Sequence, residues 1–113
     1  MSYVPDRGDI VWLDFDPQAG HEQRGRRPAI VLSPKSYNEK IELALFCPIT
    51  SQQKGYVFEV TLPQLGGKIA GVVLSDHIKS LDWRSRNADF IERAADAVVT
   101  KVQKNVQKIL LEE

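Results

Sequence analysis

The sequence has a single cysteine, no long hydrophobic run and no excess of charge of either sign. Cys47 has no second cysteine with which to form an internal disulfide, and one cysteine with two distant histidines is too few for a structural zinc site. The apolar stretches are much shorter than the roughly 20 residues that cross a bilayer, and the N-terminal segment does not resemble a secretory signal. We therefore expect a cytoplasmic protein in which Cys47 is buried and unreactive.

The length and composition favour one small folded domain. The chain has 113 residues, of which 42% are hydrophobic and 27% are charged, so residues 1–113 are predicted to form one domain around a modest core. Fifteen basic and fifteen acidic residues give a net charge of zero, so the protein as a whole does not attract nucleic acid. Arginine and lysine nevertheless outnumber acidic residues between residues 18 and 40, and this segment predicts a basic patch.

Short stretches of alternating or apolar residues, separated by Pro, Gly, Asn or Lys, predict a small barrel or rolled sheet. Trp12 and Phe58 alternate with other apolar residues and are expected in its core. After Asn87 the apolar period changes to three or four residues, which predicts an amphipathic C-terminal helix packed on the sheet. The fold class is therefore mainly β with a C-terminal α-helix. The expected strands span residues 9–15, 29–33, 43–50, 56–62 and 71–75.

The polar, glycine-containing stretch 16–27 is the first candidate for a site. It ends with His21, Glu22, Arg24, Arg26 and Arg27 just before an apolar strand. The proline after Arg27 favours an extended backbone there, so the Arg27 side chain is expected to project from a rigid element. A charged surface turn in which an arginine pairs with Glu22 explains the same spacing.

The second candidate lies where the strand 43–50 ends. Thr50 is followed by serine, two glutamines and then a Lys54-Gly turn. The Thr50 hydroxyl is suited to hydrogen bonding with a phosphate oxygen, and Lys54 to holding a nucleic-acid backbone as a point charge. A polar hairpin loop without function is the alternative for this segment.

The two candidates belong to a longer series of motifs. In chain order the series is GDIVW at 8–12, EQRGRRP at 22–28, AIVLS at 29–33, PIT at 48–50, QQKGYVFEV at 52–60 and DHIKS at 76–80. This series resembles the MazF-like (PemK-like) toxins, and the match covers nearly the whole chain to residue 84. Coverage of this extent is more specific than any single motif.

The resemblance implies a fold, an activity and partners. The fold would be an SH3-like barrel with a terminal helix, of the CcdB/PemK-like toxin class, assembled as a homodimer. The activity would be metal-independent, sequence-selective cleavage of single-stranded RNA by the toxin of a type II toxin–antitoxin system, which inhibits translation and growth. No cofactor is implied. The implied partner is a MazE-like antitoxin with an acidic disordered tail. The toxin would contact DNA only indirectly, through this antitoxin.

By position, the resemblance assigns catalytic roles to Arg27, Thr50 and Glu22. A ribose 2′-OH would attack the adjacent phosphate and leave a 2′,3′-cyclic phosphate and a 5′-OH. Tyr56 or Trp83 is suited to stacking on a base, and basic groups near the site to holding the RNA backbone. The expected RNA-binding residues are His21, Arg24, Arg26, Lys54, Tyr56, Lys79, Arg84 and Arg86.

Other interpretations stay open at this stage. A CcdB-like toxin acts by protein binding, although this chain keeps the Arg27 and Thr50 pair. A metal-dependent nuclease would use the carboxylates of Asp9, Asp14 and Asp16. An inactive SH3-like interaction module would cut nothing. Each of the two histidines also has two interpretations: His21 is either an acid–base group or exposed, whereas His77 is expected to be structural or at a dimer interface rather than catalytic.

Overall fold

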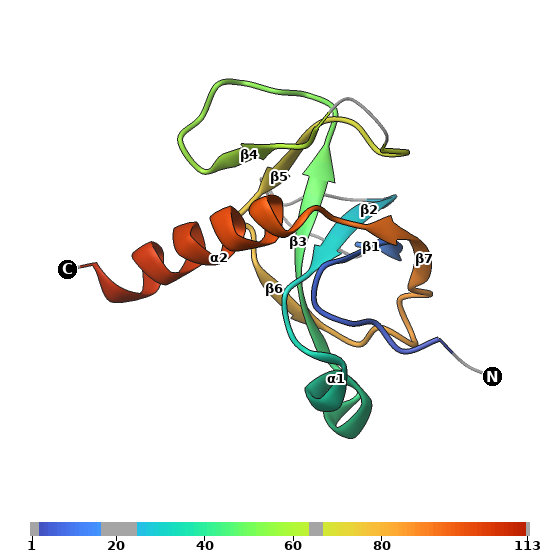
Figure 1. Cartoon of the computed structure of the whole chain (residues 1–113). Helices are drawn as coiled ribbons and strands as arrows, with labels where there is room; N and C mark the ends of the chain where they lie inside the picture. Colours follow the sequence, from blue (N-terminus) through green and yellow to red (C-terminus); the bar gives the residue numbers. More distant parts are fainter. Residues whose placement is uncertain (1–2, 17–24, 64–66, 113) are drawn as a thin grey trace.

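The computed structural model describes residues 3–16, 25–63 and 67–112. Figure 1 shows a twisted antiparallel sheet with a long C-terminal helix across one face and a short helix at one end. The elements, in chain order, are β1 (Asp9–Asp14), β2 (Arg26–Val31), α1 (Lys35–Ile41), β3 (Ala44–Thr50), β4 (Glu59–Thr61), β5 (Val72–Leu74), β6 (Lys79–Leu81), β7 (Asp89–Arg93) and α2 (Asp96–Leu111).

The sheet is built around β1, β2 and β3. Its strand order is β4-β5-β3-β2-β1-β7, and β6 also pairs with β3. Each strand pair is antiparallel. In the described part of the chain β4 and β7 lie at the two ends of this order and do not pair with each other, so the sheet curls without closing into a full barrel. The predicted class, mainly β with a C-terminal helix, is confirmed.

Two apolar clusters occupy opposite faces of the sheet, because neighbouring residues on a strand point in opposite directions. Val11 and Leu13 belong to one cluster, which also contains Phe46 of β3. Ile10 belongs to the other, in which Ile30 and the buried side chains of α2 take part. The predicted alternation in the first strand is therefore confirmed.

The prediction that Trp12 lies in the core is wrong. Trp12 shares a strand face with Ile10, but it is 39% exposed. Its neighbours across the sheet are Pro28 and Asp89, whereas the buried residues of α2 pack around Ile10. The alternating pattern correctly predicted which face of the sheet Trp12 lies on. How far α2 extends across that face determines which of its residues are buried. Phe58 is half-buried.

Three elements were not predicted from the sequence. α1 has only one buried residue, Asn38, so its sequence lacks the apolar stripe from which an amphipathic helix is predicted. Asn38 instead donates hydrogen bonds to the carbonyls of Pro5 and Ser33, at 2.8 and 2.9 Å. β6 and β7 are short strands with mixed polarity, and they become strands by pairing with β3 and β1.

The predicted amphipathic C-terminal helix is confirmed as α2. Its first half packs on the sheet through Val98, Val99 and Val102. Its second half extends beyond the sheet in Figure 1, and there Leu110 and Leu111 are 74% and 71% exposed. None of the helices within the described ranges is long and apolar enough to span a membrane.

Candidate active site

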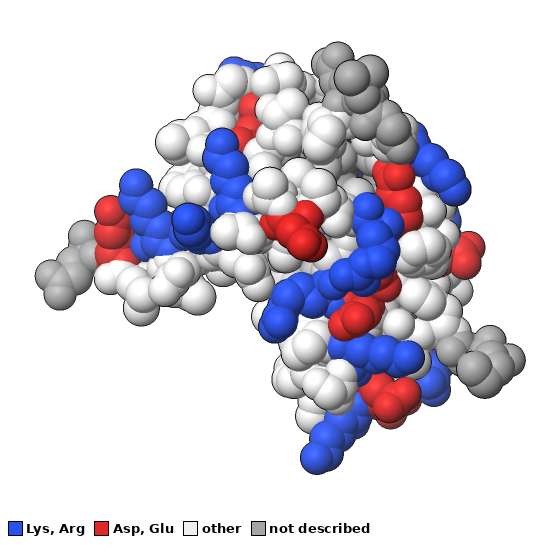
Figure 2. Space-filling model, viewed as in Figure 1, with Lys and Arg blue, Asp and Glu red and all other residues white. Residues whose placement is uncertain are grey.

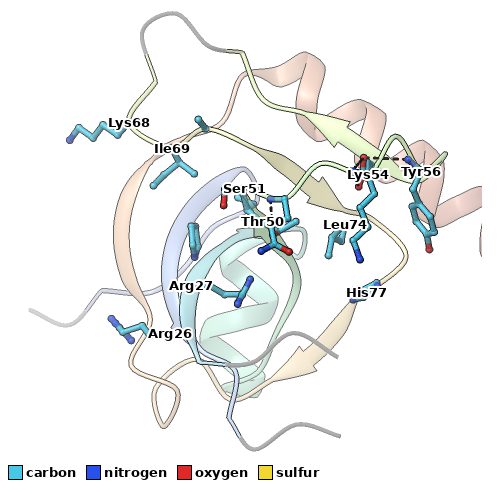
Figure 3. Close-up of a pocket in the computed structure, with 15 residues that line it drawn as sticks. Arg26, Arg27, Thr50, Ser51, Lys54, Tyr56, Lys68, Ile69, Leu74 and His77 are labelled. Atoms are coloured by element: carbon cyan, nitrogen blue, oxygen red, sulfur yellow. Dashed lines mark hydrogen bonds between the residues drawn. The ribbon is translucent and has the colours of Figure 1, made fainter. Parts of the chain in front are cut away.

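A cleft of about 600 Å³ opens where β2 begins and β3 ends. Figure 3 shows side chains from several strands and loops arranged around it, with Arg27 and Thr50 near its centre. Lys68 and Arg26 lie toward one end of this view, and Lys54, Tyr56 and His77 toward the other. The lining residues are Arg26, Arg27, Pro28, Ile49, Thr50, Ser51, Gln52, Lys54, Tyr56, Glu59, Lys68, Ile69, Ala70, Leu74 and His77.

The pairing of β2 with β3 places Arg27 and Thr50 side by side. The recorded register joins Ala29 to Pro48 and Ile30 to Cys47. Extending it by two residues toward the start of β2 sets Arg27 opposite Thr50. Directly opposed residues of an antiparallel pair share a face, with Cβ atoms about 5 Å apart. We therefore expect the guanidinium and the hydroxyl to lie within reach of one phosphate group. Both residues are half-buried.

The Thr50 side chain and backbone are both fixed. Its hydroxyl oxygen accepts a hydrogen bond from the Gln52 backbone N–H at 3.2 Å, which leaves the hydroxyl proton available for donation. Its backbone pairs with Val72 of β5. Gly71 makes this close approach possible, because a Cβ on that residue would lie 2.2 Å from the Thr50 carbonyl oxygen.

Arg26 lines the cleft, but a carboxylate on β1 and a carbonyl in the turn before β7 engage its guanidinium. It donates to the Asp14 carboxylate and to the Asn87 carbonyl, each at 2.9 Å. The Asn87 amide and the Arg26 guanidinium together lower the pKa of Asp14. Arg26 thus contributes less positive charge to the cleft than its position suggests.

Two loops bring lysines to the cleft wall. Lys54 belongs to the connection between β3 and β4, and Lys68 to the segment that precedes β5. The sequence predicted Lys54 but missed Lys68. The sequence signal that could have indicated Lys68 is the pair of glycines before it. That segment is not part of any motif on which the family resemblance was based.

Tyr56 and His77 also line the cleft. The Tyr56 hydroxyl donates to the Asp76 carboxylate, and the ring remains 45% exposed, so a base-stacking role stays compatible with its position. His77 was expected to be structural or at a dimer interface, but the structure places it on the cleft wall.

Trp83, by contrast, does not offer a surface for stacking. It is 3% exposed, and its indole N–H donates to the Asn38 carbonyl at 3.0 Å. The alternative that Trp83 stacks on a base is therefore wrong, because the ring is packed in the apolar cluster that contains Val11, Leu13 and Phe46.

Three of the predicted RNA-binding residues lie outside the cleft lining. Arg84 pairs with Glu42 at 3.1 Å and covers the Trp83 ring. Arg86 donates to the carbonyls of Asp14 and Asp16. Lys79 belongs to β6, where it pairs with the central part of β3 rather than with its end.

The described basic residues of the patch predicted between residues 18 and 40 do not lie together in the structure. Arg26 and Arg27 face the cleft, whereas Lys35 and Lys40 belong to α1, away from the cleft lining. Figure 2 shows basic and acidic side chains interleaved on the face it presents. On that face a polyanion would therefore meet no broad field of positive charge.

His21, Glu22 and Arg24 lie outside the described residues. The proposed carboxylate partner of Arg27 is among them, so its role stays a prediction.

The carboxylates of the metal-nuclease interpretation have separate partners. Asp9 is buried and accepts hydrogen bonds from Tyr3 and, at 2.7 Å, from Arg93. Asp14 is engaged by Arg26, and Asp16 accepts from the Gly25 backbone N–H. Within residues 3–16, 25–63 and 67–112, no group of three or more His, Cys, Asp or Glu side chains is arranged to hold a metal ion.

Residues 6–110 match the profile of a family described as PemK-like, MazF-like toxins of type II toxin–antitoxin systems. The chain belongs to this family. It is 55% identical over 86 residues to Endoribonuclease toxin MazF of Escherichia coli K12, which covers 76% of each chain. It is 39% identical over 111 residues to Endoribonuclease toxin ChpB of the same organism, which covers 93% of each.

Solved structures of the family have the same fold. MazF from Deinococcus radiodurans superposes with a TM-score of 0.93 at 54% identity, covering 96% of this chain and 98% of that one. A MazE–MazF complex from the same organism gives a TM-score of 0.87 at 54% identity, covering 99% and 100%. The resemblance identified from the motifs is thus confirmed, and family membership favours the main interpretation over the CcdB-like alternative.

Proposed function

We propose that this protein is an endoribonuclease toxin that cleaves single-stranded RNA, with Arg27 and Thr50 at the site of cleavage. The proposal rests on the cleft that both residues line together with Lys54 and Lys68, and on the β2–β3 register, which when extended sets Arg27 opposite Thr50. The names of the relatives, which are endoribonucleases, support the same activity.

The proposed chemistry is an internal transesterification. The ribose 2′-oxygen attacks the adjacent phosphorus, the bond to the 5′-oxygen breaks, and the products are a 2′,3′-cyclic phosphate and a 5′-OH. The 2′-OH must lose a proton and the leaving oxygen must gain one, while negative charge develops on the phosphorane. No metal takes part in this scheme.

Arg27 would stabilise that charge, because a guanidinium stays protonated and presents several N–H donors to phosphate oxygens. Thr50 would donate its hydroxyl proton to a non-bridging oxygen. Glu22 would accept the 2′-OH proton or orient Arg27. Arg27 can also assist protonation of the leaving oxygen, although its very high pKa makes charge stabilisation its main role.

The proposal is tested by incubating the purified protein with a long RNA in EDTA and mapping the cut sites by primer extension. Discrete cuts in EDTA, with cyclic phosphate at the new 3′ ends, are expected. Cleavage that needs added Mg²⁺ would favour the metal-dependent interpretation, and intact RNA would favour a protein-binding toxin or an inactive module.

The partners follow from the same proposal. Neighbouring structures are titled as MazE–MazF complexes, and we propose that a MazE-like antitoxin places an acidic disordered tail along the cleft and excludes RNA. Such a tail would order on binding. DNA would be met only through the antitoxin, and the site of action would be the cytoplasm.

We also propose a homodimer. The exposed leucines at the end of α2 form an apolar surface next to lysines, and a second copy of the chain would cover it.

A further inference from the structure

The connection between β3 and β4 is fixed by one carboxylate. Glu59, the first residue of β4, accepts hydrogen bonds from three consecutive backbone N–H groups. The Lys54 and Gly55 nitrogens lie 3.0 Å from its carboxylate oxygens, and the Tyr56 nitrogen lies 3.3 Å away. Figure 3 marks hydrogen bonds of this group beside Lys54, whose side chain extends toward Leu74 and His77 in the cleft.

A second carboxylate fixes the opposite wall in the same way. Glu92 of β7 accepts from the backbone N–H groups of Lys68 and Ile69, each at 3.0 Å. Ile69 lines the cleft together with Lys68. Glu59 and Glu92 come from β4 and β7, the strands at the two ends of the strand order, and both are half-buried.

Each carboxylate thus holds the backbone of a lysine that lines the cleft. In Figure 3 the Lys54 ammonium group lies near His77, whereas the Lys68 side chain extends outward from the end of the cleft. Hydrogen bonds from N–H groups to an ionised carboxylate are about twice as strong as those between neutral groups, so two or three of them restrict a short loop effectively. Without these hydrogen bonds, the loop and the ammonium group of its lysine would sample many positions.

We propose that Glu59 and Glu92 are positioning residues for RNA binding, which hold Lys54 and Lys68 against the phosphates on either side of the one that is cut. This inference rests on the proposed function, because it assumes that RNA lies along the cleft. Neither glutamate touches the reacting atoms.

The sign of the effect distinguishes positioning from simple electrostatics. Glutamate beside a polyanion repels it, so removal of the charge alone would tighten RNA binding. If the carboxylate positions a lysine, its replacement by glutamine weakens RNA binding instead, since an amide keeps one acceptor oxygen and turns an N–H₂ group toward the backbone donors.

The test uses Glu59→Gln and Glu92→Gln, with Glu39→Gln as the matched control. Glu39 is exposed on α1 and outside the cleft lining, so its replacement removes one charge without affecting a cleft loop. The probe is an RNA oligonucleotide that contains the mapped cut site and carries 2′-deoxyribose 5′ to the cut, which prevents cleavage. Its dissociation constant is measured by fluorescence anisotropy across a range of salt concentrations.

Glu59→Gln and Glu92→Gln are each expected to weaken binding about three- to fivefold. The slope of log affinity against log salt should fall by about 0.7, the value for one phosphate contact on a single strand. Glu39→Gln should leave both quantities unchanged. On a cleavable RNA the same two variants should raise KM and keep kcat within about twofold, because uniform binding is lost.

A double-mutant cycle shows whether Glu59 acts through Lys54. Glu59→Gln combined with Lys54→Ala should bind RNA no more weakly than Lys54→Ala alone, because the lysine that the carboxylate positions is already absent. Additive losses would show that Glu59 affects RNA binding by another route and would overturn the proposal for this residue. The corresponding pair for the other wall is Glu92→Gln with Lys68→Ala.

Unchanged or tighter binding by both glutamine variants, with wild-type cleavage intact, overturns the positioning role and leaves the proposed function standing. A wild-type protein that neither binds nor cuts RNA overturns both. Thermal unfolding by circular dichroism identifies a variant that fails to fold. If one of the two glutamine variants does not fold, the result for the other variant decides the outcome.

Discussion

At the scale of single residues, the environment of a side chain determines which of its chemical properties it can use. Arg26 and Arg27 are adjacent in the sequence and both line the cleft. Arg26 is paired with Asp14, and the β2–β3 register, extended by two residues, sets Arg27 opposite Thr50. We therefore assign charge stabilisation to Arg27 and a mainly structural role to Arg26.

Arg27→Ala should lower kcat for RNA cleavage at least about 100-fold, the usual loss when one group that stabilises transition-state charge is removed. The midpoint of thermal unfolding should change little. Arg27→Lys is the companion variant: it keeps the charge but loses the planar set of donors, so it should recover only part of the activity. Activity within tenfold of wild type in Arg27→Ala would contradict the assignment.

Cys47 illustrates burial without function. Burial, with a smaller contribution from the charge of Asp76, raises the pKa of the Cys47 thiol to about 12. The native thiol should therefore react very slowly with an aromatic disulfide reagent at pH 8 and rapidly in denaturant. Because the unfolded thiol ionises near pH 9, its contribution to stability should be lost as the pH rises from 9 toward 12. Rapid labelling of the native protein would contradict this prediction.

At the scale of elements, the site depends on how closely β5 approaches the end of β3. Gly71 has a φ of 121° and lies against the backbone of Thr50 and Ser51. No side chain can be accommodated there without moving the strand end that carries Thr50.

Gly71→Ala should lower the free energy of unfolding by more than about 3 kcal/mol, from steric overlap and backbone strain together, and should reduce cleavage even where the protein is folded. Gly55→Ala is the control for stability: it has a φ of 78° but open space around it, so it should cost only about 1 kcal/mol. Chemical denaturation compares the two variants. Equal destabilisation would show that the contact with Thr50 is unimportant.

At the scale of the whole molecule, the far end of α2 leaves an apolar surface uncovered in the described chain. Val102 is fully buried against the sheet, whereas Leu110 and Leu111 extend past it. A helix that packs over half its length and leaves the remaining leucines in water is typical of a self-association surface.

Leu110→Glu should shift the protein toward monomer in sedimentation equilibrium, because a charge would be placed in an apolar interface. The stability of the individual fold should change little, since Leu110 is exposed there. Val102→Ala provides the contrast: it should reduce stability by about 1 to 3 kcal/mol through a cavity on the sheet side of α2. A wild-type protein that is already monomeric at high concentration would refute the homodimer.

The sequence predicted the site as a pair of segments, but not its complete wall. The strand that ends at Thr50 and the one that begins near Arg27 were evident from alternation and motif. Lys68 was missed, because its one local signal, two adjacent glycines in the sequence, is common to many solvent-exposed lysines. Arg84 and Arg86 were expected near the RNA for their charge alone, and charge does not reveal that Glu42 and two carbonyl groups engage them.

The sequence by itself determined the periodic elements and the family, because hydrophobic period and motif order are properties of the chain and need no knowledge of neighbours. Tertiary structure alone decided which faces are covered, as Trp12 and Trp83 show, and which residues meet at the cleft. Burial and cross-strand contact depend on segments far apart in the sequence. Their positions are set by the packing of the whole sheet and α2, and local residue patterns cannot encode them.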